Sequence, residues 1–66
     1  MDMFRRRLME AMAMRNMNVV QLYEKSGISR YAIYSYLNKE GSPNASTLGI
    51  LADALDVSMD WLWGRD

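Results

Sequence analysis

The sequence predicts a small all-α domain of five short helices. Apolar residues recur at three- and four-residue spacings along most of the chain, which is the period of an amphipathic helix. No β-branched run alternates with polar residues for more than a few positions, as a half-buried strand would. The 66 residues suffice for one compact domain, which we place over residues 1–66.

The first helix is predicted over about residues 2–15. Its stripe at helical spacing consists of Phe4, Leu8, Ala11, Met12 and Arg15. Asn16 tolerates the left-handed backbone conformation, so we expect it to end the helix. The three consecutive arginines at 5–7 point around the helix, and we expect them to form a solvated face.

The second helix is predicted to follow after a short break, over about residues 19–25. Asn18 is expected to cap it, and Leu22 is its inward residue. Gly27 follows, and glycine adopts the positive φ of a tight turn without steric cost. These features predict a helix followed at once by a sharp change of direction.

The third helix is predicted over about residues 30–38, with Ser29 as its cap. Its inner face carries Ile33, Tyr36 and Leu37. Its other face carries Arg30, Tyr31, Tyr34 and Ser35. Because tyrosines there lie opposite the apolar stripe, we expect them to contact a partner molecule.

A loop, a fourth helix and a short fifth helix complete the chain. The segment "NKEGSPNAS" at 38–46 holds the only proline and several turn-forming residues. Asn44 or Ser46 opens the fourth helix, whose stripe consists of Leu48, Leu51, Ala52 and Leu55. Asp56 is expected to end it. Ser58 then caps a last helix over residues 59–63, which Gly64 closes.

The composition excludes most catalytic chemistry. The chain has no cysteine and no histidine, which rules out disulfides, zinc fingers and every dyad or triad that needs either residue. Its acidic residues do not cluster, and it has no glycine-rich phosphate loop. We therefore expect no enzymatic activity, no cofactor, no metal and no small-molecule substrate.

The N-terminal segment "MDMFRRRLMEAMAM" is too charged to be a signal peptide or a membrane span. We therefore expect a cytoplasmic protein with no membrane partner. Eight basic and eight acidic residues give zero net charge. The basic ones concentrate in the first 39 residues and the acidic ones dominate the last third, which predicts one anion-seeking face and one acidic face.

A second helix, a glycine turn and a third helix have the spacing of a helix-turn-helix. The chain resembles the phage repressor/Cro-type helix-turn-helix family, also described as XRE-like or lambda repressor-like. The matching residues are Leu8, Leu22, "GIS" at 27–29, Ile33, Tyr36, Pro43 and "LADALDVSMDWL" at 51–62. The register of the set, more than any single element, carries the resemblance.

The resemblance implies a sequence-specific transcriptional regulator that binds double-stranded DNA, with the third helix in the major groove. Carried over by position, the base contacts are Arg30, Tyr31, Tyr34 and Ser35, and the phosphate contacts are Asn18, Ser29, Asn38 and Lys39. Members of the family usually bind two-fold sites as homodimers. Met59 and Trp63 are our candidates for the dimer surface.

Two departures from the family pattern affect these expectations. Val19 stands where the family usually has a glutamine that contacts phosphate. Met12 and Leu37 stand where many members have a buried arginine–glutamate pair, and we predict that Met12 packs directly on Leu37. Replacing both charged partners with fitting apolar residues is often neutral or stabilising.

A second function stays open alongside DNA binding. The same fold can serve as a protein-interaction module of the antitoxin or anti-repressor kind, which would bind a protein through the tyrosine face. Zero net charge and Val19 favour this alternative, whereas Arg30, Asn38 and Lys39 favour DNA.

Overall fold

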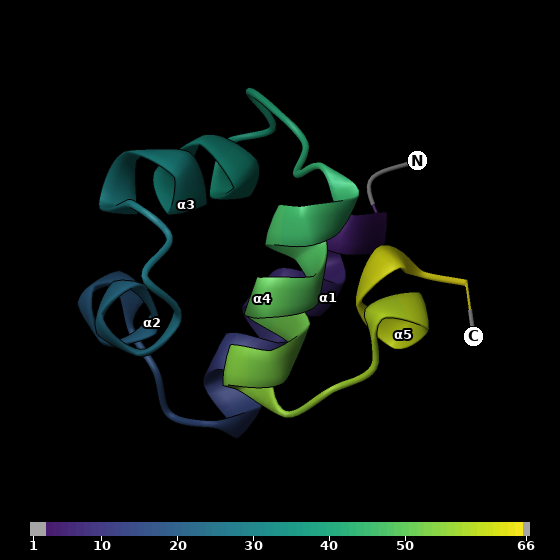
Figure 1. The fold of residues 1–66 in the computed structure, drawn as a ribbon, viewed down its shortest axis with the longest axis horizontal. Helices are drawn as coiled ribbons and strands as arrows, with labels where there is room; N and C mark the ends of the chain where they lie inside the picture. The colour runs from purple at the N-terminus through teal and green to yellow at the C-terminus, as the bar shows by residue number, and fades with distance from the viewer. Residues whose placement is uncertain (1–2, 66) are drawn as a thin grey trace.

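The computed structural model describes residues 3–65 and contains five helices over that range (Figure 1). They are α1 (Met3–Met14), α2 (Val19–Ser26), α3 (Arg30–Leu37), α4 (Ala45–Leu55) and α5 (Met59–Trp63). Helix α4 crosses in front of α1, with α2 and α3 on one side and α5 on the other. The described residues form no strand, so the prediction of a five-helix all-α fold is confirmed.

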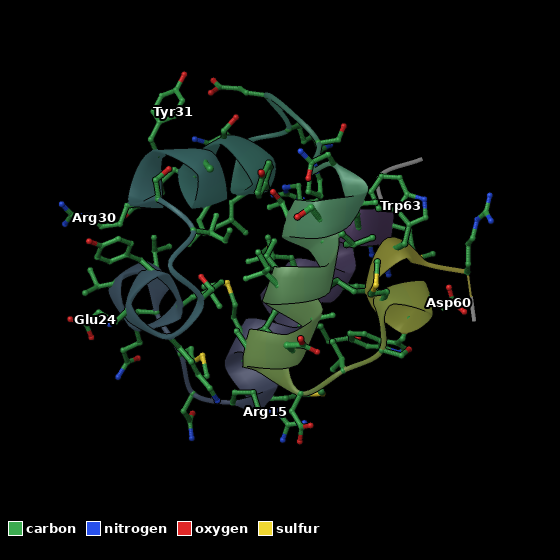
Figure 2. The ribbon with its side chains drawn as sticks, in the orientation of Figure 1. Arg15, Glu24, Arg30, Tyr31, Asp60 and Trp63 are labelled. Carbon is green, nitrogen blue, oxygen red and sulfur yellow. The ribbon has the colours of Figure 1, made fainter. Side chains whose placement is uncertain are left out.

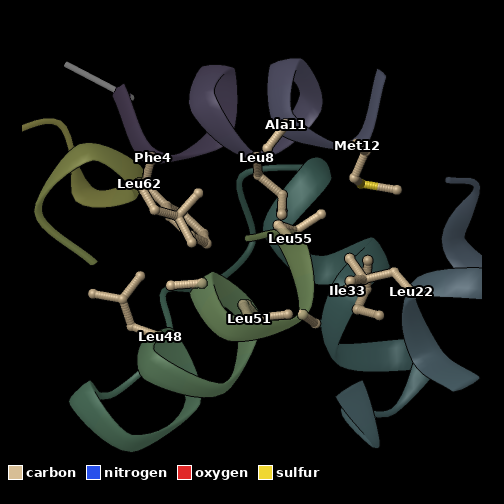
Figure 3. Packing of buried hydrophobic residues seen from close by; sticks show 12 residues of the cluster. Phe4, Leu8, Ala11, Met12, Leu22, Ile33, Leu48, Leu51, Leu55 and Leu62 are labelled. Carbon is tan, nitrogen blue, oxygen red and sulfur yellow. The ribbon is translucent and has the colours of Figure 1, made fainter. Parts of the chain in front are cut away.

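A single cluster of apolar side chains fills the space between the helices (Figure 3). Its largest fully buried members are Leu8, Leu22, Ile33, Leu51, Leu55 and Leu62. These residues come from all five helices, and each was expected on an apolar stripe except Leu62, which belonged to the family pattern. The inward stripes read from the sequence are therefore confirmed, except that Arg15, which was expected on the first of them, is exposed.

Local hydrogen bonds fix the start of four helices. The N-cap side chains accept a hydrogen bond from the backbone N–H three residues on, in Asn18, Ser29, Asn44 and Ser58. Of the two candidates for opening α4, Asn44 is the correct one. Asn18 also forms a capping box, because its own N–H donates to the side chain of Gln21 at 2.9 Å.

The helices end in left-handed residues. Four non-helical positions with positive φ follow α1, α3, α4 and α5, at Asn16, Lys39, Asp56 and Gly64. After each of them, a backbone N–H reaches back five residues, as in the Schellman motif: Met17 to Met12, Glu40 to Ser35, Val57 to Ala52 and Arg65 to Asp60. Gly27 ends α2 with φ 78°. The sequence predicted all of these terminators except Lys39.

The arginines of α1 do not form a purely solvated face, so that expectation is wrong for two of the three. Arg5 Nε donates to the Leu37 carbonyl at 2.6 Å, and Arg7 donates to the Trp61 carbonyl at 2.8 Å. The Arg7 guanidinium also lies 4.5 Å from the centre of the Trp61 ring. Of the three, only Arg6 is exposed.

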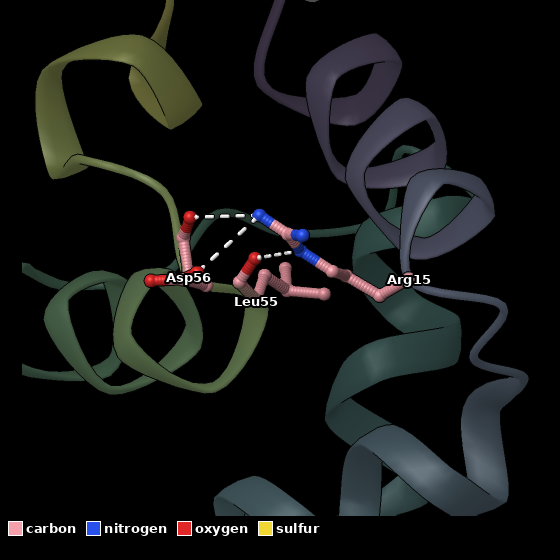
Figure 4. A network of polar contacts seen from close by, with 3 residues as sticks. All are labelled: Arg15, Leu55 and Asp56. Carbon is pink, nitrogen blue, oxygen red and sulfur yellow. Dashed lines mark hydrogen bonds and ion pairs between the residues drawn. The ribbon is translucent and has the colours of Figure 1, made fainter.

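Arg15 makes a third contact of the same kind (Figure 4). Its guanidinium donates to the carbonyls of Leu55 and Asp56 at 2.9 and 3.1 Å, and it pairs with the Asp56 carboxylate at 3.6 Å. Arg5 and Arg7 of α1 and Arg15, which follows α1, thus reach carbonyls at the ends of α3, α5 and α4 respectively. The last carbonyls of a helix have no partner within the helix, and Arg5 and Arg15 supply donors to those of Leu37 and Leu55. The Trp61 carbonyl accepts from the Gly64 N–H as well as from Arg7.

Three further expectations concern the interior and the surface. Met12 and Leu37 both belong to or pack against the core cluster, and their direct contact stays a prediction. Within residues 3–65 no helix is long and apolar enough to cross a membrane. The same residues contain no group of three or more acidic, histidine or cysteine side chains placed to hold a metal ion.

Candidate nucleic-acid interface

Helices α2 and α3 form a helix-turn-helix at one side of the molecule (Figure 1). The turn between them is short because Gly27 takes φ 78° and its N–H bonds to the carbonyl of Tyr23 at 2.8 Å. The Ser26 hydroxyl accepts from the Ile28 N–H at 3.0 Å, and Ser29 then caps α3. Leu22 and Ile33 anchor the two helices in the core. The outer face of α3 is consequently held in a fixed orientation.

The first turn of α3 projects from the body of the protein (Figure 2). Arg30 and Tyr31 extend toward the solvent, and Tyr31 is 83% exposed. Tyr34 lies one turn further along on the same side and is 51% exposed. Three of the four predicted base-contacting residues thus share one uncovered surface, which we call the α3 face: Arg30, Tyr31 and Tyr34.

Ser35, the fourth predicted base contact, is less exposed than the residues of the α3 face. Ser35 is half-buried, and its hydroxyl oxygen lies close to Gly41. If residue 41 had a side chain, its Cβ would be 3.2 Å from that oxygen. The loop after α3 therefore packs against this side chain. The structure gives Ser35 less access to a ligand than its three companions.

Tyr23 on α2 belongs to the same surface, although the sequence did not single it out. The guanidinium of Arg30 lies 5.7 Å from the centre of the Tyr23 ring, within the range of a cation–π contact. Tyr23 is 41% exposed, and Val20, its neighbour on the outer side of α2, is 42% exposed. The three-residue spacing of Val20 and Tyr23 was the available signal for an exposed apolar stripe on α2.

The predicted phosphate contacts at the helix starts retain free donors. In Asn18 the carbonyl oxygen of the side chain is used by the capping box, which leaves its amide NH2 group for a ligand. In Ser29 the hydroxyl oxygen accepts from Ala32, which leaves the hydroxyl hydrogen. Both residues are exposed. Backbone N–H groups of the first helical turn add donors that suit an anion.

Asn38 and Lys39 are exposed at the other end of α3. Lys39 has φ 62°, a conformation that residues other than glycine and asparagine seldom adopt. Its N–H bonds to the Tyr36 carbonyl at 3.3 Å, and that of Asn38 bonds to the Tyr34 carbonyl at 2.9 Å. Both predicted phosphate contacts are thus attached to a well-defined helix end.

The helix-turn-helix carries little net charge. Between residues 18 and 40 there are three basic side chains, Lys25, Arg30 and Lys39, and two acidic ones, Glu24 and Glu40. The basic residues in and just after α1 do not compensate fully, because Arg5, Arg7 and Arg15 bind carbonyls elsewhere. A single copy of the domain therefore offers few cations to a polyanion.

Met59 and Trp63, the predicted dimer residues, are the first and last residues of α5. This helix lies on the opposite side of α4 from α3 (Figure 1), and Trp63 is labelled there in Figure 2. Trp63 packs its ring against Phe4 with centroids 5.7 Å apart and remains 39% exposed. It also lines a shallow depression with Pro43, Asn44, Ala45 and Leu48. Met59 is 41% exposed and packs near Gly49 of α4. Both side chains thus pack partly against the protein and expose the rest of their apolar surface to solvent.

The comparison with protein families agrees with this geometry. A family model described as helix-turn-helix matches residues 8–62, which includes α2, the turn and α3. The chain therefore belongs to the Cro/C1-type helix-turn-helix family, and it is a DNA-binding regulatory domain. This is a family of DNA-binding regulators and not of enzymes. No curated protein and no solved structure matches the chain.

Proposed function

We propose that the protein is a sequence-specific transcriptional regulator of the repressor or Cro-like kind, of phage or prophage origin, that acts in the cytoplasm. In the proposed complex α3 lies in the major groove of double-stranded DNA, with its first turn toward the bases. Arg30, Tyr31 and Tyr34 contact base edges, and Ser35 makes a secondary contact. The whole of residues 1–66 acts as one domain.

The observation that carries this proposal is the uncovered first turn of α3. Arg30 and Tyr31 project from the molecule there, on a helix whose opposite side is anchored by fully buried Ile33. An arginine at this place can donate both branches of its guanidinium to O6 and N7 of guanine. The tyrosines offer a ring for thymine methyl groups and a hydroxyl for polar contacts. The α3 face can therefore distinguish base pairs.

The phosphate contacts are assigned to Asn18, Ser29, Asn38 and Lys39. Ser29 precedes α3, Asn38 and Lys39 follow it, and Asn18 precedes α2, so a helix in the major groove can be held at both of its ends. With few cations per copy, the affinity of one domain for DNA is low and sensitive to salt. A homodimer on a two-fold site doubles these contacts, and the exposed apolar sides of Met59 and Trp63 are its proposed surface.

A protein-interaction function is the second candidate, and one observation favours it. The outer side of the helix-turn-helix exposes four large side chains, Val20, Tyr23, Tyr31 and Tyr34. Together with the low net charge, this surface also suits a protein partner. Both candidates use the same surface, so the test has to distinguish the ligand as well as the place.

Titration of 15N-labelled protein with a DNA duplex tests the proposal. We expect amide chemical shifts to move at the starts of α2 and α3, along the first turns of α3 and at residues 38–39. The shifts should weaken as salt is raised, because phosphate contacts release counterions. Amides of α5 should move only if two copies associate on the duplex.

Two results would contradict the proposal. Absence of any shift at low salt would remove DNA as the ligand and leave the protein-interaction function. Shifts confined to α1, α4 and α5 would show that DNA binds elsewhere, and the assignment of α3 to the major groove would be wrong.

A further inference from the structure

One side chain outside the helix-turn-helix reaches the end of the proposed recognition helix. Arg5 belongs to α1, 32 residues before Leu37, and its Nε donates to the Leu37 carbonyl at 2.6 Å in a half-buried position. Within the described residues, Arg7 and Arg15 make similar contacts, but with α5 and with the end of α4. Only Arg5 of these three touches the helix that faces the proposed ligand.

The contact fills a gap that the local hydrogen bonds leave. The last four carbonyls of α3 belong to Tyr34, Ser35, Tyr36 and Leu37. The first three accept backbone N–H groups of Asn38, Glu40 and Lys39 respectively. The carbonyl of Leu37 accepts from Arg5. All four carbonyls that a helix end normally leaves without partners are therefore satisfied, the last one by a distant side chain.

This carbonyl stands immediately before the two residues assigned to phosphate. The Leu37 carbonyl is part of the peptide group that leads into Asn38, and Lys39 follows with φ 62°. A shift of this peptide group changes where the Lys39 side chain leaves the helix. Arg5 thus restrains the direction of a proposed DNA contact without lying on the α3 face.

We propose that Arg5 is a positioning residue for DNA binding, which holds the end of α3 so that Lys39 meets a phosphate group. This inference rests on the proposed function. It assigns to Arg5 a hydrogen-bonding role through Leu37, and not a direct attraction between its charge and DNA.

Two substitutions of nearly equal length separate the hydrogen bond from the charge. In Arg5→Gln the side-chain amide nitrogen is separated from Cα by the same number of bonds as Nε of arginine. The hydrogen-bond donor is therefore kept and the charge is lost. In Arg5→Met a methyl group takes that place, so both the donor and the charge are lost. Affinity is measured by fluorescence anisotropy on a duplex of about 30 base pairs of mixed sequence at low salt.

We expect Arg5→Met to weaken DNA binding about tenfold, because one charge-assisted hydrogen bond between Lys39 and phosphate contributes about that much. The affinity of Arg5→Gln should stay within about twofold of the wild type. Both variants are measured at a temperature where circular dichroism shows them fully folded. Equal affinities for the two variants, whether reduced or unchanged, would overturn the positioning role. If the wild type itself binds no duplex, the proposed function fails together with the inference.

A double-mutant cycle tests the route through Lys39. In a Lys39→Ala background the contact to be positioned is gone, so Arg5→Met should then cost no more than about twofold. A tenfold loss in that background as well would show that Arg5 does not act through Lys39 and would overturn the proposal in this form.

Discussion

Lys39 shows how a single residue can combine a structural cost with a proposed function. Its backbone has φ 62°, the region that costs a residue other than glycine about 1–2 kcal/mol. Glycine is the usual choice at such a helix end. A lysine at this place is consistent with selection for its side chain, because backbone strain often persists where function needs it.

Replacing Lys39 with glycine should therefore separate stability from DNA binding. We expect Lys39→Gly to raise the free energy of unfolding by about 0.5–1 kcal/mol, after allowing for the greater freedom of glycine in the unfolded chain. Its affinity for DNA should fall, and the slope of log affinity against log salt concentration should decrease by about one, the value for one lost phosphate contact. Urea unfolding and anisotropy titrations at several salt concentrations measure the two effects.

Lys39→Ala is the matched control for this prediction. It removes the charged side chain but keeps a Cβ in the left-handed conformation, so DNA binding should fall as in Lys39→Gly without the gain in stability. Equal stability of the two variants would show that the conformation of residue 39 carries no strain. Wild-type affinity in both would remove Lys39 from the interface.

Residue-scale features divide into those that the sequence could predict and those that it could not. Asn16, Gly27 and Gly64 were predicted as terminators because asparagine tolerates the left-handed backbone conformation and glycine, which has no Cβ, adopts it without steric cost. Lys39 gave no such signal, since its conformation depends on the surrounding helix end. The contact of Arg30 with Tyr23 was missed for a similar reason, because it depends on how two helices cross.

At the scale of elements, helix starts were predictable and the links between helices were not. A cap such as Asn18 or Ser29 bonds to an N–H three residues away, so sequence spacing reveals it. The arginines in and just after α1 bond to carbonyls 32 to 54 residues away, and no local pattern marks these partners. A triple arginine therefore suggested a solvated face, whereas two of its members hold other helices.

The start of α2 gives a prediction at the same scale. Val19 occupies its first helical position and packs partly against the core. Val19→Gln should place an amide beside the proposed phosphate contact of Asn18 and strengthen DNA binding about fivefold on every sequence, the order of one added hydrogen bond. Anisotropy titration on two unrelated duplexes measures this.

Val19→Met controls for the loss of valine packing, because it adds length without an amide. It should bind DNA no better than the wild type. If Val19→Gln also fails to gain affinity while its helix content is unchanged, the start of α2 does not approach DNA. That outcome would favour the protein-interaction function.

At the scale of the whole molecule, the distribution of charge matters more than its sum. The chain has zero net charge, and three of its eight basic side chains are engaged at helix ends. What remains near the α3 face is too little for strong nonspecific binding, so base contacts and a second copy have to supply the affinity. The domain is thus expected to depend on a two-fold site more than a strongly basic domain would.

Selection of bound duplexes from a random DNA pool, at low and at near-physiological salt, tests this most directly. We predict enrichment of a two-fold symmetric sequence whose half-sites are about ten base pairs apart, one helical turn, as expected when α3 of each copy enters the major groove. Recovery without enrichment, lost as salt rises, would mean only general attraction to phosphate. It would contradict sequence-specific recognition by the α3 face.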